Sequence, residues 1–469
     1  MTSLTIFQDF LLLAPVRTWR PAASLATGWL LFMAASSTLA QAPVSNMAPP
    51  SAFFFESFKY IAPATGTTTG VADPKRTPAQ QHIADLNAAG QYAEAGAEGL
   101  ILLAQEKPDD GLKLIIANSL AWSGRLKDAS ATYQTITENE LVPDANVGIA
   151  NILHWKGQDH LAVPIYKDIL VQSPDNNDAR TGLELASREM VPRTTVTMGG
   201  ISDSNDFRRG AATINHRWRD ESGFNVMEVE LNGEHDNQPG MDATQQDVTL
   251  RYQALGSEFK PAFELSLPSW SRRQIFAGLK LWFDDDNIQL DLGNMNWGRL
   301  ANNANALDQG LSASHVGLSG KGTVILGELS GRVDYYNVSD TNIVLTSDAR
   351  LTPNVRPFGP AIKPFLGVET RSARFNSPNY WSPIDGSGSF YMGLQGDWQL
   401  DDWMVYAIGQ AGLGLYGDAG TSWSATGGLK RWVTHDVSMG FNLWAMSSTR
   451  NGASYSSQSA FFTLEKLWQ

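Results

Sequence analysis

The sequence contains no cysteine, and this absence excludes several chemistries at once. Without thiols the chain has no disulfide framework, no thiolate nucleophile and no cysteine-based zinc site. Basic residues are also scarce, because 35 lysines and arginines face 48 aspartates and glutamates, which gives a formal net charge of -13. A chain with this balance has no overall positive field for a phosphate backbone, so we expect no nucleic-acid partner.

Long hydrophobic runs are missing after residue 40. Hydrophobic residues make up only 42% of the chain, and no later run approaches the roughly 18 apolar residues of a membrane-spanning helix. If this chain spans a membrane, it must therefore do so as a closed β-barrel, the other structure that pairs all its backbone groups within lipid. A chain of 469 residues is also too long for one ordinary core, so we expect two modules.

The first 40 residues resemble a secretory signal peptide. Arg17 and Arg20 supply positive charge, an apolar stretch spans residues 25–35, and small residues follow up to Ala40. We expect cleavage after Ala40 and export of the chain to the bacterial envelope. Residues 41–75 are rich in Pro, Ala, Ser and Thr and have no helical or strand periodicity, so we expect a linker there.

Residues 76–192 contain an internal repeat. Glycine recurs at intervals of 34 and 33 residues, at Gly90, Gly124 and Gly157. Alanine stands five residues after each of these glycines. The spacing resembles the tetratricopeptide repeat, a helix-turn-helix unit of about 34 residues. We therefore expect a short α-helical solenoid. The first unit has Gly99 where the later ones have Tyr133 and Tyr166, so we expect it to pack loosely.

From residue 193 to 469 apolar and polar residues alternate in short segments. In 390–401 the even positions are mostly apolar and the odd ones mostly polar, and 227–232, 288–293 and 325–335 alternate likewise. Alternation with a period of two, in about 16 segments of roughly ten residues, predicts an antiparallel transmembrane β-barrel. Aromatic residues near segment ends fit interfacial girdles, at Trp282, Trp297, Tyr335, Trp381, Trp403, Tyr416, Trp432 and Trp468.

A helical repeat followed by such a barrel resembles the exopolysaccharide export porins. These include the cellulose-export subunit of cellulose synthase operons and the poly-N-acetylglucosamine export porin. The resemblance covers residues 76–469, and one short motif resembles an aromatic-Ser-Pro motif of the cellulose-export family, at Tyr380, Trp381, Ser382 and Pro383.

The resemblance implies an outer-membrane channel that exports a secreted polysaccharide in cellulose biosynthesis or biofilm formation. It implies a periplasmic repeat module that docks periplasmic or inner-membrane synthase components or guides the polymer. A different class of function is an envelope scaffold or surface receptor, in which a closed barrel only anchors the repeats in outer-membrane lipid.

Alternation also assigns the two faces of the strands. Met392, Leu394 and Trp398 should face lipid, whereas polar residues of the opposite parity should face the lumen and contact a passing polymer. The candidate lumen residues are Gln289, Asp291, Glu328, Arg332, Asp334, Gln395, Asp397 and Gln399.

The sequence offers no catalytic constellation. Ser312 and Ser314 lie close to His315, but both fall on the opposite face of a strand from that histidine, so they cannot form a nucleophile–base pair with it. The acidic run 284–286 is typical of a solvated hairpin turn. We therefore expect no enzyme, no metal and no cofactor. We expect His154 and His160 to be surface or groove residues of the repeat.

Overall fold

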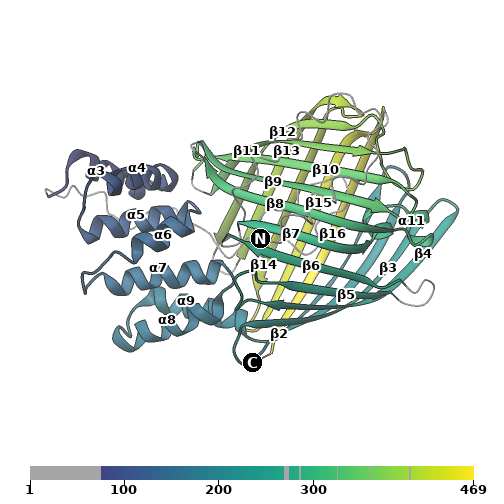
Figure 1. Ribbon diagram of the computed structural model, residues 1–469. Helices are drawn as coiled ribbons and strands as arrows, with labels where there is room; N and C mark the ends of the chain where they lie inside the picture. The colour runs from purple at the N-terminus through teal and green to yellow at the C-terminus, as the bar shows by residue number, and fades with distance from the viewer. Residues whose placement is uncertain are drawn as a thin grey trace, which may run out of the picture.

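The computed structural model describes residues 75–268, 274–284, 287–324, 326–359, 361–400, 403–450 and 452–468. The expected signal peptide, 1–40, and residues 41–74 of the expected linker lie outside the described residues. The described chain forms a group of helices beside one end of a β-barrel (Figure 1). We call the barrel end next to these helices the near mouth and the opposite end the far mouth.

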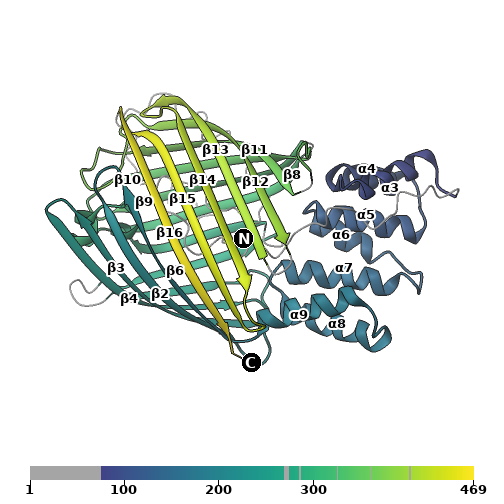
Figure 2. The same cartoon turned by 180° about the vertical axis from the view of Figure 1, so that it is seen from behind.

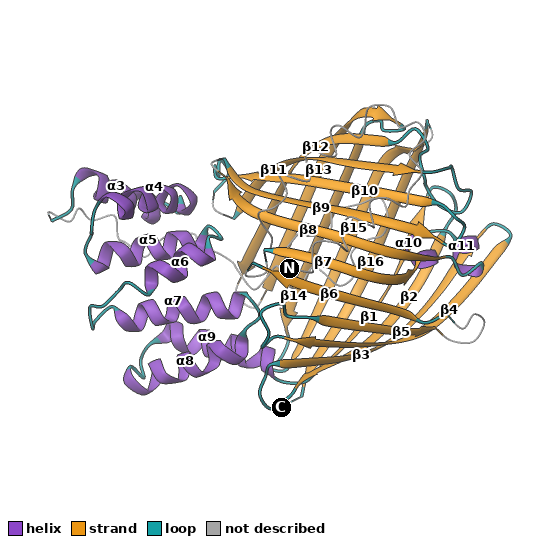
Figure 3. Ribbon diagram, viewed as in Figure 1, coloured by secondary structure: helices purple, strands orange, loops and turns teal. Residues whose placement is uncertain are grey.

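Seven helices precede the barrel in the described part of the chain. Consecutive helices pack against each other as hairpins (Figure 3), and none of the described helices is long and apolar enough to cross a membrane. The helices are α3 (Pro78–Ala88), α4 (Tyr92–Gln105), α5 (Asp110–Trp122), α6 (Leu126–Tyr133), α7 (Val142–Trp155), α8 (Asp159–Gln172) and α9 (Asn177–Met190).

The repeated glycines end the first helix of each hairpin. Gly90, Gly124 and Gly157 have φ angles of 74°, 87° and 68°, the left-handed conformation that commonly ends a helix and that glycine adopts without steric cost. The alanines five residues later are fully buried and let the paired helices approach closely, at Ala95, Ala129 and Ala162. The periodicity of the sequence therefore corresponds to the periodicity of the helices.

The first unit is tightly packed, so the prediction of loose packing was wrong. A Cβ at Gly99 would lie 2.7 Å from Cγ2 of Ile116, whose side chain is fully buried. In the next unit a tyrosine ring takes the corresponding role, because Tyr133 packs directly against Gly148. The missing aromatic in the first unit is thus replaced by a branched side chain from the following helix.

Sixteen antiparallel strands form a closed barrel, as the sequence predicted (Figure 2). Each strand pairs with its neighbours in sequence, and β16 closes the barrel against β1. The strands are β1 (Arg193–Asp203), β2 (Arg208–Arg219), β3 (Asn225–Gln238), β4 (Met241–Ala254), β5 (Ala262–Pro268), β6 (Phe276–Phe283), β7 (Ile288–Asn296), β8 (Ser312–Val324), β9 (Gly327–Val338), β10 (Ile343–Pro353), β11 (Ile362–Ala373), β12 (Ser387–Leu400), β13 (Trp403–Gly417), β14 (Ser422–Trp432), β15 (Val437–Arg450) and β16 (Ala453–Leu467).

The outer surface of the barrel is apolar. Met392 and Leu394 are 57% and 43% exposed, and they share this surface with exposed aliphatic residues of many other strands, including Met198, Ile214, Leu231, Leu250, Leu265, Leu318, Leu345, Leu366 and Leu443. An apolar belt around a closed barrel with polar residues inside is the arrangement that lipid requires.

The aromatic residues near strand ends divide into two groups. One group is exposed, as interfacial aromatics should be, and comprises Tyr335, Trp403, Tyr416 and Trp468. Trp282, Trp297 and Trp381 are not, and their prediction as girdle residues was wrong. Trp282 and Trp381 line the interior cavity, whereas Trp297 is fully buried where the β7–β8 connection packs over the barrel.

The two ends of the barrel differ in their connections. The near mouth has the two ends of the barrel chain and connections that include the short β8–β9 turn. The far mouth has the long β7–β8 and β11–β12 connections. The β7–β8 connection contains α10 (Trp297–Leu300) and α11 (Ala304–Asp308), which lie at the barrel end opposite the helical module (Figure 3).

Candidate transport channel

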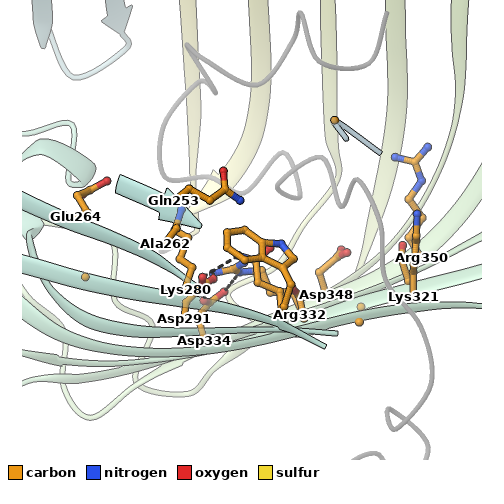
Figure 4. A pocket seen from close by; sticks show the side chains of 18 of the residues that line it. Gln253, Ala262, Glu264, Lys280, Asp291, Lys321, Arg332, Asp334, Asp348 and Arg350 are labelled. Carbon is orange, nitrogen blue, oxygen red and sulfur yellow. Dashed lines mark hydrogen bonds and ion pairs between the residues drawn. The ribbon is translucent and has the colours of Figure 1, made fainter. Parts of the chain in front are cut away.

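One cavity of about 1700 Å³ occupies the barrel and extends to the helical module. It is lined by the inward side chains of most strands and by the helix turns around Gly90, Gly124 and Gly157. Figure 4 shows side chains from several strands, among them Asp291 and Arg332, gathered on its wall. The cavity is larger than typical small-molecule pockets, which measure roughly 300–1,000 Å³. Its lining extends from Arg299 and Trp381 at the far mouth to the turns of the helical module.

Seven of the eight candidate lumen residues line this cavity, namely Gln289, Asp291, Glu328, Arg332, Asp334, Gln395 and Asp397. The side chain of Gln399 lies outside the described residues. Arg332 donates to Asp291 at 2.8 Å and to Asp334 at 2.7 Å. Gln395 donates to Asp397 at 3.3 Å. The lumen wall therefore contains polar side chains that form hydrogen bonds and ion pairs with one another.

Further ionic groups line the wall of β3–β5 and were not among the predicted candidates. Arg251 donates to Glu230 at 2.9 Å and to Glu264 at 2.7 Å, and it also contacts Glu228. The alternation in 227–232 already placed Glu228 and Glu230 on one face. Their partner lies on the neighbouring strand, so the sequence pattern gave the face and not the pairing.

At the far mouth, charged residues tie the β7–β8 connection to the inner wall. Arg299, in α10, donates to Glu234 at 3.3 Å and to Asp247 at 3.1 Å. Arg209 forms a two-bond ion pair with Asp236, at 2.7 and 2.6 Å, and donates to the carbonyl of Arg299 at 2.6 Å. Two-bond arginine–carboxylate pairs fix orientation as well as charge. The connection is therefore held over the lumen wall.

These pairings leave a lumen that is polar without one dominant charged pocket. Acidic and basic side chains line the cavity in comparable numbers, and many of them are joined in ion pairs. Paired charges cancel much of each other's field at a distance. Such a wall offers hydrogen-bonding groups along its whole length.

Two connections meet above the far mouth. Trp297 packs against Tyr336 and Tyr380, with ring centroids 4.9 and 5.3 Å apart. Asn305, in α11, donates to Asn379 at 2.6 Å, which joins the β7–β8 connection to the β11–β12 connection. We call these two joined connections the far cap.

The Tyr380–Pro383 motif belongs to the far cap. The Tyr380 hydroxyl donates to Asp340 at 2.9 Å, and the buried Ser382 accepts a hydrogen bond from the backbone of Ser377 at 2.6 Å. Trp381 lines the cavity, with the guanidinium groups of Arg371 and Arg450 near its ring. The motif thus shapes the channel at its far end.

At the near mouth a buried ionic network fixes the helical module to the β2–β3 turn. Asp159 accepts a hydrogen bond from Arg219 at 3.2 Å, and its other oxygen lies 2.5 Å from Nδ1 of His154. His160 packs against Phe224 with ring centroids 4.4 Å apart. Both histidines are buried, so the prediction that they are surface or groove residues was wrong.

His315 is part of the barrel wall. Its Nε2 lies 2.7 Å from Asp334, and its ring stacks on Tyr336 at 4.7 Å. Ser314 is exposed, while His315 is buried. Among the described residues no group of three or more His, Cys, Asp or Glu side chains could hold a metal ion. Residues 285 and 286 of the acidic run lie outside the described part.

No family model matches the sequence, and no curated protein matches it. Solved structures do resemble it. A bacterial polysaccharide outer membrane secretin is 12% identical, with a TM-score of 0.48 over 60% of this chain and 99% of that one. OccK11 (OpdR) of Pseudomonas aeruginosa is 10% identical, with a TM-score of 0.34 over 59% and 96%. A BenF-like porin from Pseudomonas fluorescens Pf-5 is 7% identical, with a TM-score of 0.35 over 59% and 98%.

The membrane assignment follows from the molecule itself, because sixteen strands close into a barrel with an apolar outer surface and a polar interior cavity. The chain is a β-barrel channel of the bacterial outer-membrane type, with a helical module at its near mouth.

Proposed function

We propose that this chain exports a secreted polysaccharide across the outer membrane, with the helical module in the periplasm at the entrance. One observation carries the proposal: a single cavity is lined both by the turns of the helical module and by the inner wall of the barrel. A barrel that served only as an anchor would not need a helical module aligned with its lumen. The near mouth is then periplasmic and the far cap extracellular.

The chemistry of the lumen suits a flexible polyol. A sugar chain needs many hydrogen-bonding groups along its path and no single tight site that would hold it. The candidate residues supply amide, carboxylate and guanidinium groups at successive positions, and water can bridge the remaining distances. We propose that Gln289, Glu328 and Gln395 are among the groups that the polymer passes. Synthase components are the proposed partners of the helices, and cellulose is one candidate polymer.

Deletion of the gene tests the proposal in the cell. We expect loss of extracellular polysaccharide and of pellicle formation, with restoration by the intact gene. Unchanged secretion in a deletion strain with a healthy envelope would contradict the proposal.

The absence of cysteine permits a second test on the purified protein. Gln395→Cys places the only thiol on the lumen wall, and Leu394→Cys places it on the outer surface. We expect a bulky maleimide to reduce single-channel current in planar bilayers for Gln395→Cys and to leave the current of Leu394→Cys unchanged. A barrel that conducts no current, with or without the helical module, would indicate an anchor.

A further inference from the structure

The turn edge of the helical module carries a row of aromatic residues. Trp122 and Trp155 stand at the same place in successive units, two residues before Gly124 and Gly157. Both line the cavity in front of the near mouth, and both have intermediate exposure. Tyr92 lines the same cavity and packs edge-on against Trp122, with ring centroids 4.8 Å apart. The repeat thus places aromatic faces at regular intervals along the entrance.

A third tryptophan, Trp282, lies at the near mouth of the barrel, close to the aromatic residues of the helical module. Lys127, in the first turn of α6, lies 3.9 Å from Asp284, which brings the start of α6 next to the β6–β7 turn. Trp282 precedes Asp284 by two residues and pairs directly with Gln289, a lumen residue. It shares its face of β6 with Lys280, whose side chain lies on the cavity wall in Figure 4. Aromatic faces are therefore present on both sides of the entrance.

Hydrogen-bonding side chains accompany these rings. Arg125 and Lys156 follow the repeat tryptophans closely in the sequence, and Gln289 pairs with Trp282 across β6 and β7. Gln253, near the end of β4, lines the same cavity as these residues. An indole ring offers a flat apolar face to C–H groups, while guanidinium and amide groups bind hydroxyls. A pyranose ring presents both kinds of group, with C–H bonds on its faces and hydroxyls around its edge.

A protein partner is a weaker fit to this arrangement. The tryptophans line the internal passage, whereas a docking protein would more readily use the outer surface of the helices. The observations therefore favour a thin, flexible chain.

We propose that Trp122, Trp155 and Trp282 form an entrance subsite that stacks on the pyranose rings of a polysaccharide and directs the chain into the lumen. The identity of the ligand as the exported polymer rests on the proposed function. The binding itself does not, and it can be measured separately.

The test uses the full chain in detergent micelles and calorimetric titration with cellohexaose and with the β-linked hexamer of N-acetylglucosamine. Because Trp155 also packs against the helical core, the main variant combines Trp122→Leu with Trp282→Leu. We expect the parent to bind at least one hexamer and this variant to bind it about tenfold more weakly, a loss of about 1.4 kcal/mol. Trp122→Phe with Trp282→Phe keeps an aromatic face and should retain most of the affinity.

Trp423→Leu is the matched control, since Trp423 is 50% exposed on the outer surface of the barrel. Its affinity should equal that of the parent, and thermal unfolding should show that every variant is folded. The proposal is overturned if the parent binds neither hexamer, or if the double leucine variant binds as tightly as the parent. The two proposals can fail separately. If hexamer binding depends on these tryptophans but deletion of the gene leaves secretion unchanged, the subsite is supported and the export function is contradicted.

Discussion

At the scale of single residues, the two faces of β12 give the sharpest test of the barrel. Leu394 is exposed on the outer surface, so Leu394→Arg should cost about 2–4 kcal/mol, as expected for a cation facing lipid near the bilayer midplane. Gln395→Arg should assemble normally, because Asp397 accepts a hydrogen bond from residue 395 and the lumen is polar. Heat-modifiable migration on gels measures assembly. Failure of Gln395→Arg together with normal assembly of Leu394→Arg would invert the assignment of the faces.

Sequence pattern predicted the faces of residues well and their partners poorly. Alternation placed Asp291 and Arg332 on the lumen side, because a pleated strand turns successive side chains to opposite faces. Their ion pair joins residues 41 positions apart in the sequence, and only the strand register brings them together. The same limit applies to Trp297. A tryptophan near a strand end can lie at a membrane interface or be buried under a loop that packs over the barrel. The alternation of polar and apolar residues does not distinguish these two positions.

At the scale of elements, the contact of α8 with the β2–β3 turn should depend on pH. Burial is the main cause that lowers the pKa of His160, and the cations Arg219 and Lys260 act in the same direction, whereas Asp159 and Asp220 oppose them. When the module unfolds, the imidazole regains its ordinary pKa of 6.5. Between the lowered pKa and 6.5 the unfolded state therefore binds more protons, so stability falls as pH decreases through this range.

The measurement is chemical unfolding of the helical module, followed by tryptophan fluorescence at pH 8 and pH 5.5. We expect a lower unfolding midpoint at pH 5.5. His160→Phe keeps a ring against Phe224 and should reduce the difference. His82→Phe is the control, because the side chain of His82 is 59% exposed. An equal pH effect in the parent and in His160→Phe would assign it to other groups.

The presence of helices was easier to predict from the sequence than the way in which they pack together. Glycines at intervals of 34 and 33 residues predicted the helix turns, because a left-handed turn favours glycine wherever it occurs. The repeat alone did not predict that Ile116 would fill the space beside Gly99. That contact depends on the side chain presented by the next helix, and a periodic pattern carries no information on it. The buried network around Asp159 was missed for a similar reason, since its arginine comes from the barrel.

At the scale of the whole molecule, the two mouths of the barrel are built differently. The near mouth opens onto the helical module, whose turns line the cavity. The far mouth carries the far cap, in which the two connections are joined by the packing of Trp297 on Tyr380 and by the hydrogen bonds of Asn379. Asn379 accepts a hydrogen bond from Asn305 and donates to Gln309 at 3.2 Å. One side chain thus joins two segments that are otherwise attached to different strands.

Asn379→Ala should therefore loosen the far cap without weakening the barrel. Removal of both hydrogen bonds weakens the junction of the β11–β12 connection with α11 and leaves the contact of Trp297 with Tyr380 in place. We therefore expect a more fluctuating single-channel conductance with normal assembly on gels. Asn376→Ala is the matched control, because among the described residues Asn376 accepts a hydrogen bond within its own connection, from the backbone of Ile384 at 3.1 Å. If Asn379→Ala leaves the conductance unchanged, or if Asn376→Ala changes it equally, the junction of the two connections does not control the exit. Because the substitution lies far from Trp122 and Trp282, binding of sugar hexamers at the entrance should stay at the parental level in both variants.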